Sequence, residues 1–349
     1  MAQGAVAADS GVLVDAVADA PLTVVIGEVN LGKTTLAARL ATALHARGHA
    51  VGVLDADVGQ SEIGPPTTVG LGRVVRPLTR LADAERVALR FVGATSAVRD
   101  QLATVVGVAR LAARARALGL TRVIVDTSGL VRGDLGLRLK QAKIDALDPD
   151  LVLAIDRDGE CEPIVAPYRR AGRPRIIRVA GVSAARPRSS DERRLHRERA
   201  LASHFASAAR ATVDLGHVAL RRPALFVGEP IDPDELADAS ADGPELVWGE
   251  RRGGEVAVVS RGRLAEAERR ALSRRLQASG FVDHAAEDIV GMLAGLENEH
   301  LETLALGVVV AVDFSARAMT VETTADVNRI VAIAVGRERA PGRAALGKT

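Results

Sequence analysis

Aromatic residues and cysteines are scarce in this chain. Only 2% of its 349 residues are aromatic, with one tryptophan, one tyrosine and five phenylalanines. The aromatic platforms on which single-stranded nucleic acids commonly stack therefore have few side chains to draw on. Cys161 is the only cysteine, which excludes an intrachain disulfide and a cysteine-built zinc site.

The sequence also lacks a long hydrophobic run and a basic N-terminal segment. No apolar stretch reaches the length of a membrane span, and the first basic residue is Lys33. Acidic residues such as Asp9, Asp15 and Asp19 are atypical of a signal peptide. We therefore expect a cytoplasmic protein without membrane association. A composition of 48% hydrophobic and 26% charged residues predicts a folded chain, long enough for two domains.

The most informative motif lies between an apolar stretch at 22–26 and a helical pattern at 36–44. Its Gly-x4-Gly-Lys-Thr spacing is typical of a P-loop, whose backbone amides and helix N-terminus bind phosphates. A glycine-rich turn that happens to contain a lysine is the alternative, disfavoured because strand, spacing and helix agree. Lys33 would reach the β- and γ-phosphates, and Thr34 would hold Mg²⁺. We expect nucleotide binding by Gly27, Glu28, Val29, Asn30, Leu31, Gly32, Lys33, Thr34 and Thr35.

Acidic residues follow two further apolar strand patterns. Asp55 and Asp57 end the stretch 51–54, and Asp126 ends the stretch 123–125. Ligands of open α/β sheets collect at the carboxyl ends of strands, so these carboxylates should lie near the P-loop phosphates. One acid of the pair can orient Mg²⁺ and the other can accept a proton from a hydroxyl, while Asp126 fits the Walker-B role of holding Mg²⁺. The alternatives are a polar turn for the pair and a helix cap for Asp126.

Apolar runs alternate with helical patterns along the first half of the chain. We expect strands at 22–26, 51–54, 89–92, 122–125, 151–155 and 175–179, and helices near 36–44, 99–118 and 135–146. Apolar strands separated by amphipathic helices predict parallel strands covered on both faces. The fold class is therefore α/β, a doubly wound, mostly parallel P-loop sheet.

The pattern changes beyond about residue 216, where a smaller, largely β domain is expected. Segments 245–248 and 255–259 flank a short glycine-containing turn, as in a hairpin. Further strands are expected at 304–313, 318–322 and 329–335, with helices near 264–277 and 289–296. The predicted organisation is a flexible tail over 1–20, a P-loop domain over 21–215 and a C-terminal domain over 216–349.

Positive charge is concentrated in one segment, although the formal net charge is only +2. Between Val165 and Arg222 there are fourteen arginines and no lysine against four acidic residues. An anionic partner could dock there. The alternative is compositional, because the whole chain favours arginine over lysine.

Together these motifs resemble the polynucleotide 5′-hydroxyl kinases, which include the RNA kinases of mRNA cleavage, tRNA splicing and ribosomal-RNA processing. The resemblance rests on the P-loop, on Asp-Ala-Asp-Val-Gly-Gln at 55–60 with Pro65-Pro66, on 91–96, on 126–133 and on an arginine-rich lid at 188–205. It extends only weakly into the C-terminal domain. It implies Mg²⁺-dependent transfer of the γ-phosphate of ATP or GTP to the 5′-hydroxyl of RNA or DNA.

The resemblance implies roles for residues at the sheet edge. Asp57 would be the general base on the substrate hydroxyl, and Asp55 would support the metal. Gln60 would contact the acceptor or the waters of the metal. Thr127 and Gly129 match the clasp that grips the phosphate next to the acceptor.

The resemblance also implies a role for the arginines of the lid. Arg188 and Arg193 would close over the transferring γ-phosphate, with Arg197 and Arg199 as helpers. Guanidinium groups suit a transition state that spreads charge over three equatorial oxygens. A solvated arginine-rich helix is the alternative.

Two departures from the family pattern leave other functions open. Leu130 stands where members of the family often have a tryptophan that stacks on the terminal base, and Ala97-Val98-Arg99-Asp100 lacks the expected Pro/Gly pattern. One alternative is a P-loop kinase or ligase that acts on a small anionic metabolite. A second is a regulatory P-loop NTPase that switches a partner.

Overall fold

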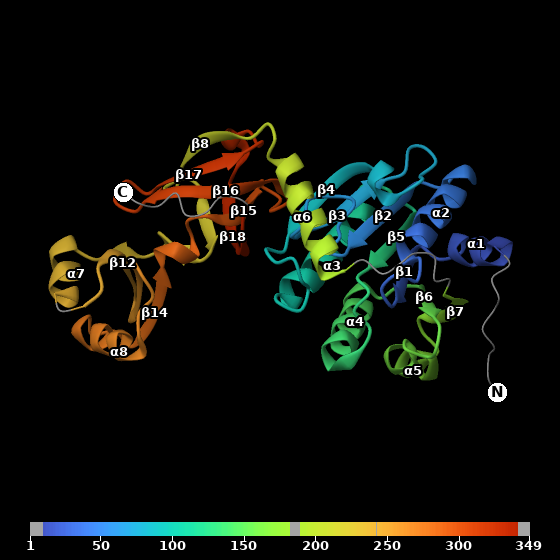
Figure 1. Ribbon diagram of the computed structural model, residues 1–349, viewed down its shortest axis with the longest axis horizontal. Helices are drawn as coiled ribbons and strands as arrows, with labels where there is room; N and C mark the ends of the chain where they lie inside the picture. Colours follow the sequence, from blue (N-terminus) through green and yellow to red (C-terminus); the bar gives the residue numbers. More distant parts are fainter. Residues whose placement is uncertain (1–9, 182–188, 242, 341–349) are drawn as a thin grey trace. The chain divides into compact units, whose positions relative to one another are not determined.

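The computed structural model of this chain describes residues 10–181, 189–241 and 243–340. The chain divides into two compact units, residues 1–200 and 201–349. Helix α6, Ser190–His204, crosses the boundary between them (Figure 1). Among the described residues, no helix is both long enough and apolar enough to cross a membrane.

The first unit is built on a seven-stranded sheet with the order β4-β3-β2-β5-β1-β6-β7. Strands β2, β5, β1, β6 and β7 are parallel, and β3 is antiparallel to its neighbours β2 and β4. The strands are β1 Leu22–Gly27, β2 Val51–Ala56, β3 Thr68–Arg73, β4 Glu85–Phe91, β5 Arg122–Thr127, β6 Leu151–Asp156 and β7 Arg175–Ala180. The mostly parallel sheet predicted from the alternation of strands and helices is confirmed.

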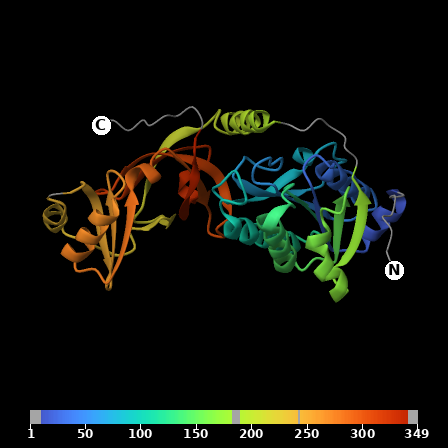
Figure 2. The same ribbon diagram turned by 60° about the horizontal axis from the view of Figure 1, so that its bottom comes forward.

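Helices cover both faces of this sheet (Figure 2). One hydrophobic cluster joins the sheet to α3, α4 and α5, and another joins it to α1 and α2. Along β1, Val24 and Ile26 belong to the first cluster and Val25 to the second, which is the period of two expected for a strand buried on both sides. The helices are α1 Ser10–Ala18, α2 Lys33–Ala46, α3 Gln101–Ala117, α4 Gly133–Leu147 and α5 Glu162–Ala171, with a 3-10 turn at Leu81–Asp83.

Strand β3 is absent from the sequence prediction because its glycines lower strand propensity. The structure gives a reason for one of them. A Cβ atom on Gly70 would lie 2.8 Å from the carbonyl oxygen of Ile63. The loop after β2 therefore packs directly on the backbone of β3, and this contact fixes the segment that contains Asp57.

Helix α1 differs from the flexible segment predicted over residues 1–20. Leu13 and Val17 are 6% and 0% exposed and pack in the same cluster as α2. Arg122 Nε donates to the carbonyl oxygen of Ala18 at 2.5 Å. The helix is short, so its stability comes from this tertiary packing, which the local sequence does not reveal.

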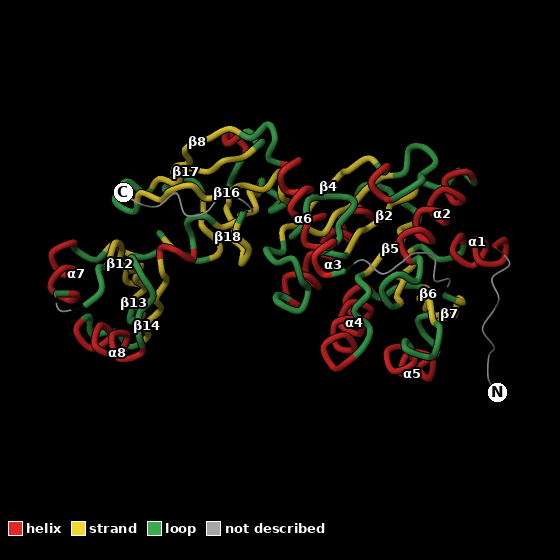
Figure 3. Tube along the Cα trace, in the orientation of Figure 1, coloured by secondary structure: helices red, strands yellow, loops and turns green. Residues whose placement is uncertain are grey.

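The second unit is largely β, as predicted, and contains two sheets (Figure 3). The seven-stranded sheet has the order β10-β9-β18-β15-β16-β17-β8 and the four-stranded sheet the order β11-β12-β13-β14. The strands are β8 Ala209–Asp214, β9 Ala219–Arg222, β10 Ala224–Leu225, β11 Glu229–Pro230, β12 Leu246–Arg252, β13 Glu255–Ser260, β14 Gly280–Ala285, β15 Met292–Glu297, β16 Thr303–Asp313, β17 Ala318–Thr323 and β18 Ala332–Arg339. The remaining elements are helices α7 Pro233–Ser240 and α8 Glu266–Arg275, with 3-10 turns at Ala286–Asp288 and Val327–Arg329.

Two sequence predictions for the second unit differ from the structure. The segment 289–296, predicted as a helix, contains most of β15, which lies between β18 and β16. A short apolar run that is buried on both faces cannot be distinguished from a helix by periodicity. The domain boundary predicted at 215/216 lies too far toward the C-terminus. Strand β8 pairs with β17, and the two units divide after Ala200.

The packing of α1 predicts that Leu13→Ala destabilises the protein by about 2–4 kcal/mol, because it removes a buried side chain and leaves a cavity. Val12→Ala on the same helix is the control, since Val12 is 57% exposed. Denaturant unfolding of both variants measures the difference. Equal free energies of unfolding for the two variants would contradict the packing of α1 against α2 and the sheet.

Candidate active site

The P-loop connects the end of β1 to the start of α2. A Cβ atom on Gly27 would lie 2.7 Å from the carbonyl oxygen of Ile155 in β6, so only glycine fits there. Gly32, at the N-terminus of α2, has φ 82°, and Asn30 has φ 64°. These left-handed residues curl the backbone in the manner of a phosphate-binding nest.

Lys33 lies inside this loop. Its Nζ donates to the carbonyl oxygen of Glu28 at 2.7 Å, and the residue is 7% exposed. Burial lowers the pKa of Lys33, while the carboxylates of Asp126 and Asp57 oppose this change. A phosphate oxygen could replace the main-chain oxygen as partner of this ammonium group, which agrees with the predicted role of Lys33.

Thr34 and Asp126 meet at the start of α2. Thr34 Oγ1 donates to Asp126 Oδ2 at 2.6 Å, and Asp126 is 4% exposed. Burial raises the pKa of Asp126 to about 6. Its other oxygen, Oδ1, is buried and has no hydrogen-bond partner among the described residues. A buried, unpaired carboxylate oxygen beside a hydroxyl fits the protein ligands of Mg²⁺ in a P-loop enzyme.

The protein ligands alone do not complete a metal site. Within the described part of the chain, no group of three or more His, Cys, Asp or Glu side chains could hold a metal ion. Mg²⁺ bound to a nucleotide commonly takes most of its ligands from phosphate oxygens and water, so Thr34 and Asp126 stay its candidate protein ligands.

Asp55 is engaged by the loop that follows it. Asp55 Oδ1 accepts from Asp57 N at 3.0 Å, and Oδ2 accepts from Glu62 N at 2.5 Å, Ile63 N at 3.2 Å and Ser61 Oγ at 3.2 Å. Burial raises the pKa of Asp55 to about 7. These contacts give Asp55 a role in holding the loop, and its support of a metal stays a prediction.

Asp57 is arranged differently from Asp55. Its Oδ1 accepts from Gly59 N at 3.0 Å and Gln60 N at 3.1 Å. Among the described residues these are the hydrogen bonds of its carboxylate, which leaves Oδ2 available to a substrate. Gln60 Nε2 donates to the carbonyl oxygen of Gly59 at 2.8 Å, and the buried Gln60 Oε1 has no described partner. The contacts of Asp57 and Gln60 with an acceptor stay predictions.

The segment after β5 packs against the P-loop. A Cβ atom on Gly129 would lie 2.6 Å from Val29 N and 2.4 Å from Val29 Cγ2. The hydroxyl of Thr127 is turned inward, where it donates to the carbonyl oxygen of Val25 at 2.7 Å and accepts from Lys140 Nζ at 2.8 Å. The hydroxyl of Thr127 is therefore not directed at a substrate, and the contact predicted for the clasp would have to be made by Gly129 and the main chain.

A pocket of about 370 Å³ lies between these two loops and helix α6. Helix α6 begins with a reciprocal cap, in which Glu192 N donates to Ser189 Oγ and Ser189 N donates to Glu192 Oε2. This start places Arg193 in the first turn, where it contributes to the pocket. The lining residues are Glu28, Val29, Asn30, Gly129, Leu130, Val131, Arg132 and Arg193.

The other predicted lid arginines are placed less directly. Arg197 lies on α6 one turn beyond Arg193, and both residues are partly buried, whereas Arg194 and Arg199 are exposed. Residues four apart share one face of a helix, so Arg197 lies on the same face as Arg193. Arg188 lies outside the described residues.

Sequence reasoning missed two basic residues at this site, Lys140 and Lys143, whereas Arg132 belongs to the motif at 126–133. Arg132 Nε donates to Glu28 Oε1 at 2.6 Å and its Nη2 to Glu28 Oε2 at 3.2 Å, which joins the clasp segment to the P-loop. Lys140 and Lys143 on α4 are 0% and 1% exposed. The sequence signal that could have identified the two lysines is their spacing, because residues three apart lie on one face of a helix that must pack on a sheet.

These features define a P-loop protein in which the phosphate loop, the segment after β5 and Arg193 line one pocket. Residues 27–207 match the family described as "mRNA cleavage and polyadenylation factor CLP1 P-loop", and the chain belongs to this family. The resemblance drawn from the motifs is thereby confirmed.

The chain is similar to two archaeal proteins along most of its length. It is 29% identical to a polyribonucleotide 5′-hydroxyl-kinase of Pyrococcus furiosus over 316 residues, 90% of this chain and 86% of that protein. It is 30% identical to a polyribonucleotide 5′-hydroxyl-kinase of Thermococcus kodakarensis over 320 residues, 90% and 87% of the two chains. Clp1p, in its complex with Pcf11p, has a similar fold, with a TM-score of 0.57 and 12% identity over 91% of this chain and 74% of that one.

The close approach of Gly129 to Val29 predicts that Gly129→Ala lowers nucleotide affinity and activity at least about tenfold. The added methyl group must displace the P-loop backbone, and overpacking of this kind costs about 1–3 kcal/mol. Gly262→Ala is the control, because nothing lies within 4 Å of a Cβ atom there. Titration with a fluorescent nucleotide measures the effect, and unchanged affinity in Gly129→Ala would contradict the contact.

Proposed function

We propose that this protein transfers the γ-phosphate of a nucleoside triphosphate to the 5′-hydroxyl end of a polyribonucleotide, with Mg²⁺ as cofactor and ATP or GTP as donor. Family membership and the named activity of relatives that match about 90% of the chain support the proposal. The observation that carries it in this structure is the position of Asp57. A carboxylate with a free oxygen follows β2 at the edge where the P-loop and Asp126 lie.

The register of the sheet brings these groups together. Asp55 in β2 is paired with Asp126 in β5, and Asp126 is paired with Val25 in β1, which leads into the P-loop. Asp57 directly follows the last paired residue of β2, Ala56, which is opposite Thr127. The acid, the phosphate loop and the clasp segment therefore occupy adjacent strand ends, as ligand-binding groups of open α/β sheets do.

The chain's own residues account for the steps of the transfer. Asp57 accepts the proton of the substrate 5′-hydroxyl. At the same time the oxygen of that hydroxyl forms a bond to the γ-phosphorus, and the bond between the γ-phosphorus and the oxygen that bridges it to the β-phosphate breaks. Lys33 and Arg193 stabilise the charge on the transferring group, and the nucleoside diphosphate leaves. When bound, Mg²⁺ supplies charge neutralisation on the β- and γ-phosphates, with Thr34 and Asp126 as its protein ligands.

A transfer assay tests this function. The protein is incubated with γ-labelled ATP or GTP and an RNA with a 5′-hydroxyl, in parallel with DNA of the same sequence and with 5′-phosphorylated RNA. We expect label on the 5′-hydroxyl RNA, and none with Lys33→Ala. Label released only as inorganic phosphate would identify an NTPase instead, and absence of label from all three oligonucleotides would overturn the proposal.

Asp57→Asn should reduce kcat by about 10²–10⁴-fold, because an amide is nearly isosteric but cannot accept the proton. Nucleotide binding should persist. Glu62→Gln removes the same charge from the same loop and should leave kcat unchanged, since Glu62 is exposed and accepts only a 3.4 Å hydrogen bond from Ala82 N among the described residues. An active Asp57→Asn would remove the general-base role from this residue.

Arg193→Lys should lower kcat about tenfold or more at saturating RNA, because a point charge cannot replace a planar guanidinium that holds two phosphate oxygens. Arg194→Lys is the matched control, since Arg194 is exposed on the same helix and pairs with Asp191 and Glu198. Steady-state kinetics at two salt concentrations separate the possibilities. A change confined to KM and abolished by salt would indicate that α6 only attracts the polyanion.

A further inference from the structure

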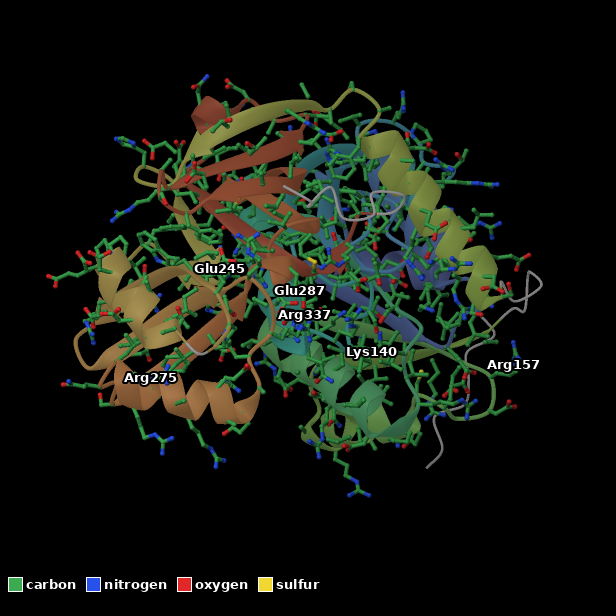
Figure 4. The ribbon with its side chains drawn as sticks, turned by 60° about the vertical axis from the view of Figure 1, so that its left-hand side comes forward. Lys140, Arg157, Glu245, Arg275, Glu287 and Arg337 are labelled. Atoms are coloured by element: carbon green, nitrogen blue, oxygen red, sulfur yellow. The ribbon has the colours of Figure 1, made fainter. Side chains whose placement is uncertain are left out.

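Two lysines of α4, Lys140 and Lys143, lie completely inside the first unit. They are 0% and 1% exposed and are the two largest of the fully buried side chains. Figure 4 labels Lys140 on α4. Lysine is almost never fully buried without a partner, because the ammonium group loses its hydration. The steps of the transfer proposed above do not use either residue.

Lys140 holds the segment that follows Asp126. Its Nζ donates to Thr127 Oγ1 at 2.8 Å and to the carbonyl oxygen of Ser128, and lies 3.5 Å from Ser128 Oγ. These are the two residues that precede Gly129, which packs on Val29 of the P-loop. Lys140 therefore fixes the turn that leads into the clasp.

Lys143 holds the residue that precedes Asp57. Its Nζ donates to the carbonyl oxygen of Ala56 at 3.2 Å. The N–H of the same peptide group belongs to Asp57 and donates to Asp55 Oδ1 at 3.0 Å. The peptide plane is thus held at both ends, which fixes the direction in which the Asp57 side chain leaves the backbone.

The two lysines act on opposite members of one register pair. Ala56 is the last residue of β2 and Thr127 the last of β5, and their Cα atoms are partners in the parallel pairing of these strands. Lysines three residues apart lie on one face of α4, so the two ammonium groups can reach the two strand ends side by side.

Anchoring a helix to a sheet does not require this arrangement. Replacing buried charged groups by apolar side chains of similar volume is often neutral or stabilising, and α4 already contributes Leu139, Ile144 and Leu147 to the hydrophobic cluster. Both lysines donate directed hydrogen bonds to the strand ends, and the charge of Lys143 interacts with the charges of Asp57, Asp55 and Asp126. Apolar side chains can do neither.

We propose that Lys140 and Lys143 are positioning residues for phosphoryl transfer, in which Lys143 orients Asp57 through the Ala56–Asp57 peptide and Lys140 orients the clasp through Thr127 and Ser128. This inference rests on the proposed function. Misplacement of a reacting group by about 1 Å can cost about 10²-fold in rate, so loss of either ammonium group should affect turnover without affecting the nucleotide site directly.

The two lysines should be separable by kinetics. Lys143→Met should lower kcat about tenfold or more, with the KM for 5′-hydroxyl RNA within about twofold of wild type, because the base is misoriented. Lys140→Met should raise the KM for RNA at least about fivefold with a smaller loss of kcat, because the clasp is loosened. Both variants should bind nucleotide with wild-type affinity.

Controls distinguish positioning from a structural role. Lys143→Gln retains a donor toward the Ala56 carbonyl and should recover part of the kcat that Lys143→Met loses. If Lys143→Met does not fold, Lys143→Gln replaces it as the test of Lys143. Arg138→Met removes a positive charge from the exposed face of α4, where Arg138 pairs with Asp134, and should be silent. Denaturant unfolding of all variants shows whether the losses of kcat follow losses in the free energy of unfolding.

The outcomes are distinct. Folded Lys143→Met and Lys140→Met proteins with wild-type kcat and KM would overturn this inference, as would losses that follow the free energy of unfolding and show no split between kcat and KM. If wild-type protein does not phosphorylate RNA at all, the proposed function fails. If wild type is active, Asp57→Asn is inactive and the lysine variants are unaffected, only the inference fails.

Discussion

Burial of charge at one sheet edge is the constraint on which this site depends. Asp55 and Asp126 are 2% and 4% exposed on paired strand ends, and burial raises the pKa of both carboxyl groups. Burial likewise lowers the pKa of Lys143 to about 8 and that of Lys140 well below its ordinary value. The lysines of α4 and these acids interact electrostatically, since the charges of Asp57, Asp55 and Asp126 oppose the effect of burial on the pKa of Lys143.

The same constraint separates the roles of the two acids in the Asp-x-Asp motif. Asp55 is saturated by donors of its own loop and so shapes the path of residues 57–63. Asp57 uses one oxygen to accept from Gly59 and Gln60 and presents the other. A carboxylate that is to accept a proton needs an open oxygen and a fixed direction, and the first acid supplies the fixed direction of the second.

The fold and the outline of the site could be predicted because their signals are local. The spacing of Gly27, Gly32 and Lys33 defines a phosphate loop by itself. The burial of Leu13 and the partners of Lys140 and Lys143 could not be predicted, because they depend on which surfaces meet after folding. Thr127 shows the limit most clearly, since its motif indicates a substrate contact while its hydroxyl faces Val25 and Lys140.

The scarcity of aromatic residues bears on how this site recognises a polynucleotide. The pocket beside the P-loop is lined by Leu130, Arg132 and Arg193 together with P-loop residues, where a stacking tryptophan would give base contact. Leucine offers apolar contact to a base without the stacking energy of an aromatic ring. The guanidinium group of Arg193 suits a phosphate, whereas that of Arg132 is paired with Glu28. Under the proposed function, binding of the strand end would then depend mainly on its backbone, which would make recognition sensitive to salt and largely indifferent to sequence.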